Sequence, residues 1–239
     1  MIDNRPFAPR TDLEGGYYLD ELDASSVVDD PIELESPDDC VGCVLRRVVD
    51  ASDCVSGASL VVAATFRAGS IEQSHLYSMT TGLKLESTFA PSMRPVAFAC
   101  LEFEGALRQF ALFEMDVDDG CPEADASSGD ESCERLFMLP ELDEVTANGL
   151  RTPRILSGPE GDTLLGTVSS SAGVSIVSAD VVNGPNGPIL DTTPIVDVVG
   201  NPSSFVLAQL NEEPEIDFVS LVSDALKPAE SRLVVQTES

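Results

Sequence analysis

The segment Asp116-Val117-Asp118-Asp119-Gly120 holds the residues of this chain that are best suited to bind a metal ion. Closely spaced carboxylates followed by a glycine can wrap a hard cation such as Ca2+, because the glycine permits a sharp turn. The full spacing of an EF-hand and its terminal glutamate are missing, so a solvated acidic loop is the alternative. Ca2+ is the only cofactor that the sequence predicts, and its candidate ligands are Asp116, Asp118, Asp119 and Asp125.

Six cysteines form the second set of reactive residues, and an even number is typical of a disulfide framework. Cys121 and Cys133 bracket a polar, acidic insert between two apolar runs. A disulfide at the base of this loop would stabilise the chain by roughly 3 kcal/mol. Cys40, Cys43 and Cys54 lie close together in the sequence, which predicts one bridge to Cys54.

Zinc is the alternative for the first two of these cysteines, because Cys40-Val41-Gly42-Cys43 has the spacing of half a zinc knuckle. A second such pair is missing from the sequence, and His75 is its only histidine. We therefore favour disulfides. Cys100 lies inside an apolar run and either pairs with the remaining cysteine or stays free in the core.

Nucleophilic catalysis would depend on His75 as a base. This residue lies beside Leu76 and Tyr77 in an alternating run that is typical of a strand. The sequence contains no Gly-x-Ser-x-Gly elbow, phosphate-binding loop or dinucleotide fingerprint. The 42 acidic residues form too many pairs to single out two for glycoside hydrolysis. We predict no catalytic residue, and we expect a protein that is not an enzyme.

The charge balance is 13 basic against 42 acidic residues, a net charge of −29. Nucleic acids are excluded as partners, because their binding requires cations that neutralise phosphates. No apolar run approaches the roughly 18 residues of a membrane span. The first residues lack the pattern of a leader peptide, so the chain is either cytosolic or has lost its leader. The cysteines favour an extracytoplasmic location, in the periplasm, at the cell surface or outside the cell.

The elements that must position these residues are strands, because the chain is rich in Val, Ser and Thr and shows no strong helical pattern. Four apolar runs recur at intervals of roughly 40 to 55 residues, the range of propeller blades. Each run follows a turn and is accompanied by three further strand-like segments. The four central runs are Ser59–Phe66, Arg108–Phe113, Thr163–Val168 and Ser204–Leu210.

This recurrence predicts an all-β, β-propeller-like fold with about four four-stranded repeats, with a β-sandwich as the alternative. Residues 1–38 form an acidic N-terminal extension, from which one strand around Tyr17 could dock. Residues 39–239 form the propeller-like domain. Its repeats are expected at about 40–90, 91–150, 151–193 and 194–239.

The segment Phe205–Val219 resembles a degenerate FG-GAP/VCBS repeat, in which a strand leads through an acidic loop into the next strand. The residues that carry this resemblance are Asn211, Glu213, Pro214 and Glu215, whereas most of the family's calcium-loop Asp and Gly residues are absent. The resemblance implies a propeller fold and a secreted or cell-surface binding role.

We therefore expect a non-enzymatic binding or structural module with a protein partner, serving as a subunit of a cell-envelope or surface assembly. The first alternative is a carbohydrate-active hydrolase or lyase on a propeller scaffold, with carboxylates at its mouth. The second alternative is a calcium-dependent adhesion domain.

Overall fold

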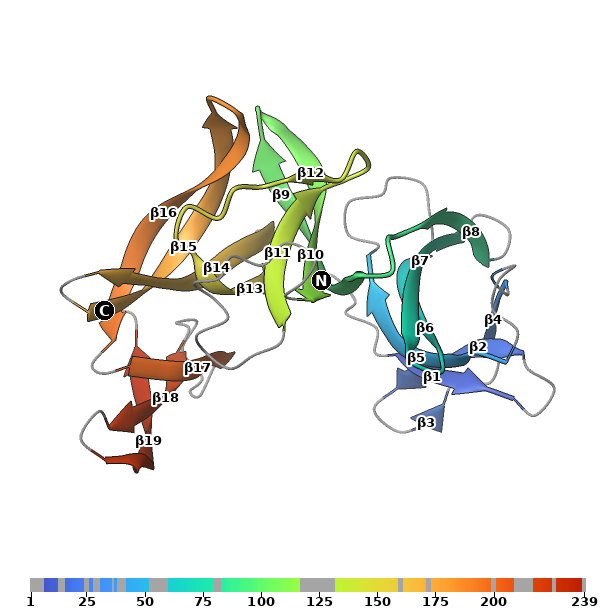
Figure 1. Ribbon diagram of the computed structural model, residues 1–239, viewed down its shortest axis with the longest axis horizontal. Helices are drawn as coiled ribbons and strands as arrows, with labels where there is room; N and C mark the ends of the chain where they lie inside the picture. Colours follow the sequence, from blue (N-terminus) through green and yellow to red (C-terminus); the bar gives the residue numbers. More distant parts are fainter. Residues whose placement is uncertain are drawn as a thin grey trace. The chain divides into compact units, whose positions relative to one another are not determined.

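The computed structural model describes residues 7–12, 16–23, 26–27, 31–35, 37, 42–51, 60–79, 83–116, 132–158, 161–170, 173–198, 201–208, 217–224 and 227–237. In this part of the chain the strands β1 to β19 are present and helices are absent (Figure 1). The chain divides into two compact units, of which the first contains Met1–Leu101 and Gly105–Glu144 and the second contains Glu102–Glu104 and Val145–Ser239.

The first sheet lies in the first unit and has the strand order β1-β2-β4-β8-β7-β6-β5, with β3 paired to β2. All neighbours are antiparallel except β4 and β8, which are parallel. Its strands are β1 Phe7–Thr11, β2 Tyr17–Asp23, β3 Ser26–Val27, β4 Ile32–Leu34, β5 Val44–Asp50, β6 Leu60–Ala68, β7 Ile71–Met79 and β8 Leu83–Thr88.

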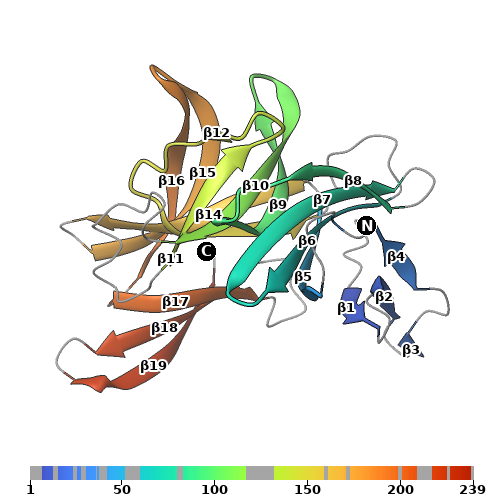
Figure 2. The ribbon, with the colours of Figure 1, turned by 45° about the vertical axis from the view of Figure 1, so that its right-hand side comes forward.

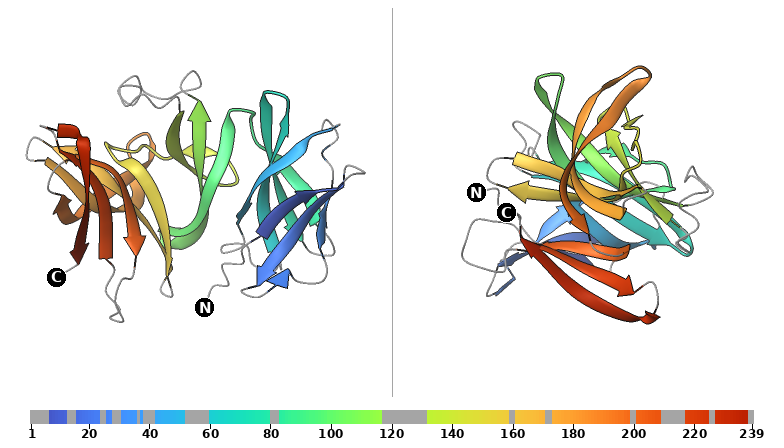
Figure 3. Two further views of the ribbon diagram at one scale, coloured as in Figure 1. Left: turned by 90° about the horizontal axis from the view of Figure 1, so that it is seen from below. Right: turned by 90° about the vertical axis from the view of Figure 1, so that its left-hand side faces the viewer.

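The acidic extension thus contributes the four strands β1 to β4 to this sheet, where the sequence analysis expected one docked strand. The sheet curls so that these strands lie across its other half, shown in blue and cyan in Figure 3. The Tyr17 hydroxyl donates to the Cys43 carbonyl at 3.1 Å, and the Tyr77 hydroxyl donates to the Glu35 carbonyl at 3.0 Å. Buried hydroxyl groups require hydrogen-bond partners of this kind.

The other sheets are antiparallel meanders, and the second lies mostly in the first unit. It contains β9 Met93–Phe103, β10 Ala106–Asp116, β11 Ser132–Met138 and β12 Asp143–Glu144. In the second unit, one sheet contains β13 Arg151–Gly158, β14 Gly161–Ser170, β15 Gly173–Gly184 and β16 Gly187–Val198. The last sheet contains β17 Asn201–Ala208, β18 Asp217–Asp224 and β19 Lys227–Thr237.

Strand β6 consists of an apolar run without alternation, and the packing of both its faces explains why this run forms a strand. Val62, Ala64 and Phe66 pack into one core cluster beneath the strands of the extension. Val61 and Ala63, which point to the opposite face because side chains alternate along a strand, pack into a second cluster. That second cluster joins the first sheet to the second and contains Phe89, Phe98, Phe113 and Phe137.

Tight turns join the longest strands. Glu104 and Gly105 between β9 and β10 both have positive φ, 54° and 73°. This conformation matches the twist of a two-residue hairpin and favours glycine. The segment 183–188, rich in Asn, Gly and Pro, forms the hairpin of β15 and β16, which Figure 2 shows as a long twisted ribbon.

These sheets confirm the prediction of an all-β, propeller-like fold with about four antiparallel repeats. Besides the extension, the start of the fourth repeat differs from the expected position of about residue 194. The run that begins at Ile195 belongs to β16 of the third sheet. The reason is a register shift opposite Ile176 and Val177, which lets β16 continue beyond Pro194.

Candidate functional site

A cavity of about 430 Å³ lies in the first unit and is lined by strands of its two sheets. Its lining residues are Arg46 and Arg47 of β5, Thr65 of β6, Glu72 of β7, Arg94 of β9 and Glu114 of β10. We call this cavity the arginine pocket. Three guanidinium groups and two carboxylates leave it with one excess positive charge, although the chain as a whole carries −29.

A β-bulge places two adjacent arginines in this pocket. The register of β5 against β6 shifts between Leu45 and Arg47, so that Leu45 opposes Phe66 and Arg47 opposes Thr65. Arg46 is the extra residue of the bulge. In regular pairing adjacent side chains point to opposite faces, whereas a bulge re-aims one of them. Both arginines therefore line the same cavity.

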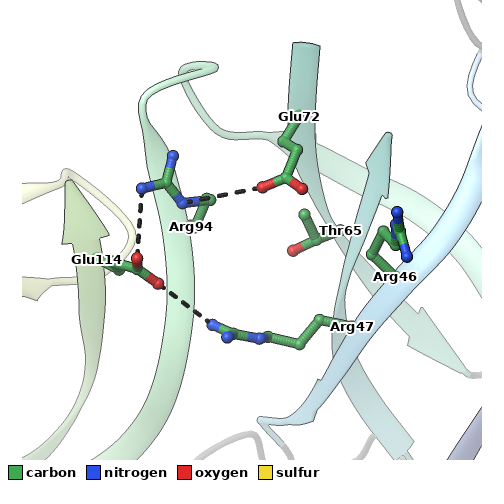
Figure 4. A pocket seen from close by; sticks show the side chains of 6 residues that line it. All are labelled: Arg46, Arg47, Thr65, Glu72, Arg94 and Glu114. Carbon is green, nitrogen blue, oxygen red and sulfur yellow. Dashed lines mark ion pairs between the residues drawn. The ribbon is translucent and has the colours of Figure 1, made fainter. Parts of the chain in front are cut away.

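Ion pairs connect the residues that the second sheet contributes to the arginine pocket with Arg47 of β5. Glu114 accepts two guanidinium groups, one on each carboxylate oxygen: Arg94 at 3.5 Å from Oε1 and Arg47 at 3.7 Å from Oε2. Arg94 also lies 4.0 Å from Glu72. Figure 4 shows Arg94 and Arg47 approaching Glu114 from two sides, whereas the Arg46 side chain points away from Glu114. Among the described residues, no partner ion-pairs with Arg46.

The floor of the pocket is buried and uncharged. Thr65 and Ser74 are both buried, and their hydroxyl groups lie 2.9 Å apart in a hydrogen bond across β6 and β7. The Thr65 hydroxyl is therefore already engaged. The groups with spare hydrogen-bonding capacity are the guanidinium donors and the carboxylate acceptors.

His75 lies in the core beneath the extension strands, on the strand that the sequence predicted. Its Nδ1 atom is 2.9 Å from the Thr88 hydroxyl, and its ring packs against Phe66 at 5.6 Å between centroids. Only 4% of the residue is exposed. Burial lowers the pKa of His75 below its ordinary value. We assign it to the packing of the core.

This burial predicts a pH dependence of stability. Because the folded-state pKa of His75 is lowered, its contribution is complete above the unfolded value of about 6.5 and is lost as the pH falls below it. Urea unfolding of the wild type and of His75→Gln at about pH 7.5 and about pH 5.5 measures this effect. The stability advantage of the wild type over the variant should shrink at the lower pH. An advantage that stays constant or grows would contradict it.

The predicted calcium ligands lie mostly outside the described residues. Asp116 is the last residue of β10 and pairs with Ser132 of β11, whereas Asp118, Asp119 and Asp125 are not described. Within the described ranges, no group of three or more His, Cys, Asp or Glu residues could hold a metal ion. The calcium loop stays a prediction from the sequence.

Calcium binding can be tested by thermal unfolding with excess CaCl2 and with EDTA. A site that binds only the folded chain would stabilise it by about 2.7 kcal/mol when the ion is at a hundred times its Kd. We expect Tm to rise with calcium, and the rise to disappear in Asp118→Asn/Asp119→Asn. The matched control Glu102→Gln/Asp180→Asn replaces two acidic residues outside the loop. This variant should keep the rise of Tm with calcium. Equal Tm values with calcium and with EDTA would remove the loop from the candidate sites.

Three of the six cysteines lie in the described part of the chain. Cys43, Cys100 and Cys133 are disulfide-bonded, and no described cysteine is free. Cys133 stands opposite Met115 in the β10–β11 hairpin. Cys40, Cys54 and Cys121 lie outside the described residues. The pairing of Cys121 with Cys133 therefore stays a prediction.

No protein-family model matches this chain. No curated protein matches its sequence. Among solved structures, the chain is similar to the crystal structure of a GH43_1 enzyme from Xanthomonas citri. The two share 12% sequence identity with a TM-score of 0.34, over 98% of this chain and 86% of that chain.

In the described ranges, no helix is long and apolar enough to cross a membrane.

The arginine pocket was not predicted from the sequence, because its residues are spread from position 46 to position 114. One signal points to it in retrospect: Arg46 and Arg47 are adjacent arginines in a chain with few basic residues. The arrangement can bind an anionic group through guanidinium donors. It can also accept hydrogen bonds through Glu72 and Glu114.

Proposed function

We propose that this chain is a non-enzymatic binding module of an extracytoplasmic compartment. The observation that carries the proposal is the ion-pair network of the arginine pocket, in which Glu72 and Glu114 both contact guanidinium groups. Glycoside hydrolysis requires one carboxylic acid that is protonated as a general acid and a second carboxylate across the bond. Two carboxylates held by arginines form a recognition site more readily than such a pair.

The extracytoplasmic part of the proposal is supported by the oxidised state of Cys43, Cys100 and Cys133. Structural disulfides form and persist in oxidising compartments. Lysis of source cells in denaturant with an excess of a thiol-alkylating reagent, followed by mass spectrometry, tests it. Unmodified cysteines would support this location, and fully alkylated cysteines would place the chain in a reducing compartment.

We further propose that the module serves in a cell-envelope or surface assembly with a protein partner, as the FG-GAP/VCBS resemblance implies. The net charge of −29 makes copies of this chain repel one another, so we expect the partner to be a different protein. The segment that carries the resemblance, from Asn211 to Glu215, lies outside the described residues.

A carbohydrate-active hydrolase is the second candidate, because one pocket brings Glu72 and Glu114 together. Incubation with oligosaccharides of pentoses, hexoses and uronic acids, with detection of new reducing ends, separates the two functions. A binding module releases none. Release by the wild type that is lost in both Glu72→Gln and Glu114→Gln, but kept in Glu102→Gln, would establish the hydrolase and overturn our proposal.

A further inference from the structure

We propose that the arginine pocket binds a small sugar acid, which places its carboxylate against the unused donors of Arg47 and its hydroxyl groups against Glu72 and Glu114. This inference rests on the proposed function as a binding module and names the ligand class of that site. It follows from the position of the guanidinium groups, the capacity that they leave unused, the volume of the cavity and the charge of the whole chain.

The guanidinium groups already converge on a carboxylate. Glu114 lies between Arg47 and Arg94, with one oxygen toward each. The distances of 3.7 and 3.5 Å exceed the roughly 2.7–2.9 Å of a charge-assisted hydrogen bond. The donors of Arg47 are therefore not saturated by Glu114, and each guanidinium carries five N–H groups.

Arg46 supplies the charge that the internal carboxylates do not balance. It is exposed, it lines the pocket through the bulge, and it has no ion pair within the described ranges. A single guanidinium can hold one carboxylate by two parallel hydrogen bonds, and a second arginine that lines the same pocket adds positive charge. Side chains of Arg46 and Arg47 are both accessible, the latter with 48% of its side chain exposed.

The hydrogen-bond acceptors of the pocket indicate which groups the rest of the ligand carries. Glu72 and Glu114 keep carboxylate lone pairs that Arg94 and Arg47 do not use, and Thr65 is already bonded to Ser74. These acceptors favour a ligand with several hydroxyl donors. The cavity volume of about 430 Å³ lies within the range of about 300–1,000 Å³ that is typical of sites for small molecules.

The charge of the chain argues against a polyanionic occupant. At −29 overall, the protein repels an acidic protein segment or nucleic acid before it reaches the pocket. A small ligand with a single negative charge experiences far less repulsion. The same argument disfavours inorganic phosphate, which carries more charge and offers few donors to Glu72 and Glu114.

The test is isothermal titration of the intact protein with sodium glucuronate, glucose, sodium phosphate and a peptide of four aspartates. We expect glucuronate to bind at least about tenfold more tightly than each of the other three. Arg46→Gln/Arg47→Gln should weaken glucuronate binding by about tenfold or more. Arg67→Gln, on the same sheet but outside the pocket, is the matched control and should bind as the wild type does.

Each outcome separates this inference from the proposed function. Equal binding of glucuronate and glucose, no binding of glucuronate, or an unchanged Kd in Arg46→Gln/Arg47→Gln would overturn the sugar-acid site. Tighter binding of the aspartate peptide would overturn it in favour of a protein ligand. Release of new reducing ends from uronic acid oligosaccharides by the wild type would instead overturn the non-enzymatic function and leave the ligand class standing. Circular dichroism of each variant establishes that it is folded.

Discussion

Replacing Phe113 by alanine should lower the free energy of unfolding by about 3–5 kcal/mol. Phe113 is fully buried at the centre of the cluster that joins the first two sheets. Its ring meets those of Phe89 and Phe137 edge to face, at 5.0 and 5.6 Å between centroids. The substitution removes these contacts and leaves a cavity that the surrounding strands can fill only in part.

Urea unfolding followed by circular dichroism measures this loss, since the chain lacks tryptophan for fluorescence. Leu107→Ala on the same strand is the matched control, because Leu107 is 71% exposed. It should change the free energy by no more than about 0.5 kcal/mol. The loss for Phe113→Leu should lie between the losses for Phe113→Ala and Leu107→Ala. A loss below about 1 kcal/mol for Phe113→Ala would mean that the two sheets do not pack through this cluster.

Replacing Tyr17 by alanine should cost about 3–5 kcal/mol, the range for large aromatic residues in a core. Tyr17 is buried, its ring lies edge to face 4.9 Å from that of Phe66, and its hydroxyl donates to the Cys43 carbonyl. The change removes a packed ring and leaves that carbonyl without this donor. Tyr17→Phe, which keeps the ring, should cost about 1–3 kcal/mol.

The neighbouring Tyr18 is a matched control for the docking of the acidic extension. Its side chain is half-buried and packs against the Arg10 guanidinium, 4.8 Å from the ring centroid. Such a contact at the surface contributes about 0.5–1 kcal/mol, so Tyr18→Ala should cost no more than that. If Tyr17→Ala lowers the free energy of unfolding by no more than about 1 kcal/mol in the same urea titration, the extension does not form part of the core.

The sequence predicts the strands well where the hydrophobic pattern is local. The runs around Val62, Leu112 and Leu164 become the buried strands β6, β10 and β14, because uninterrupted apolar residues are stable only when both faces are covered. The prediction is weaker in the extension, where the run Tyr17-Tyr18-Leu19 indicates one docked strand but four strands form. The burial of Tyr17 and Leu19 depends on Phe66 and Tyr77, far away in the sequence, so the local pattern does not give the extent of the docking.

The candidate site could not be predicted because it depends on register. Arg46 and Arg47 would point to opposite faces of a regular strand, and Glu114 belongs to another sheet. The sequence pattern instead predicts a site in the acidic loop, because the carboxylates of that loop lie close together in the sequence. A contiguous motif is visible in a sequence, whereas a pocket assembled from five strands becomes visible only when the chain is folded.

The bulge at Arg46 makes the pocket sensitive to chain length as well as to side-chain identity. Deletion of the single codon for Arg46 would convert β5 to uninterrupted antiparallel pairing, in which Leu45 still opposes Phe66 and Arg47 still opposes Thr65. The core would keep every apolar contact, while one of the two adjacent guanidinium groups would vanish. An insertion or deletion of three nucleotides can therefore add or remove one guanidinium group of the pocket while the pairing of β5 with β6 on either side is kept.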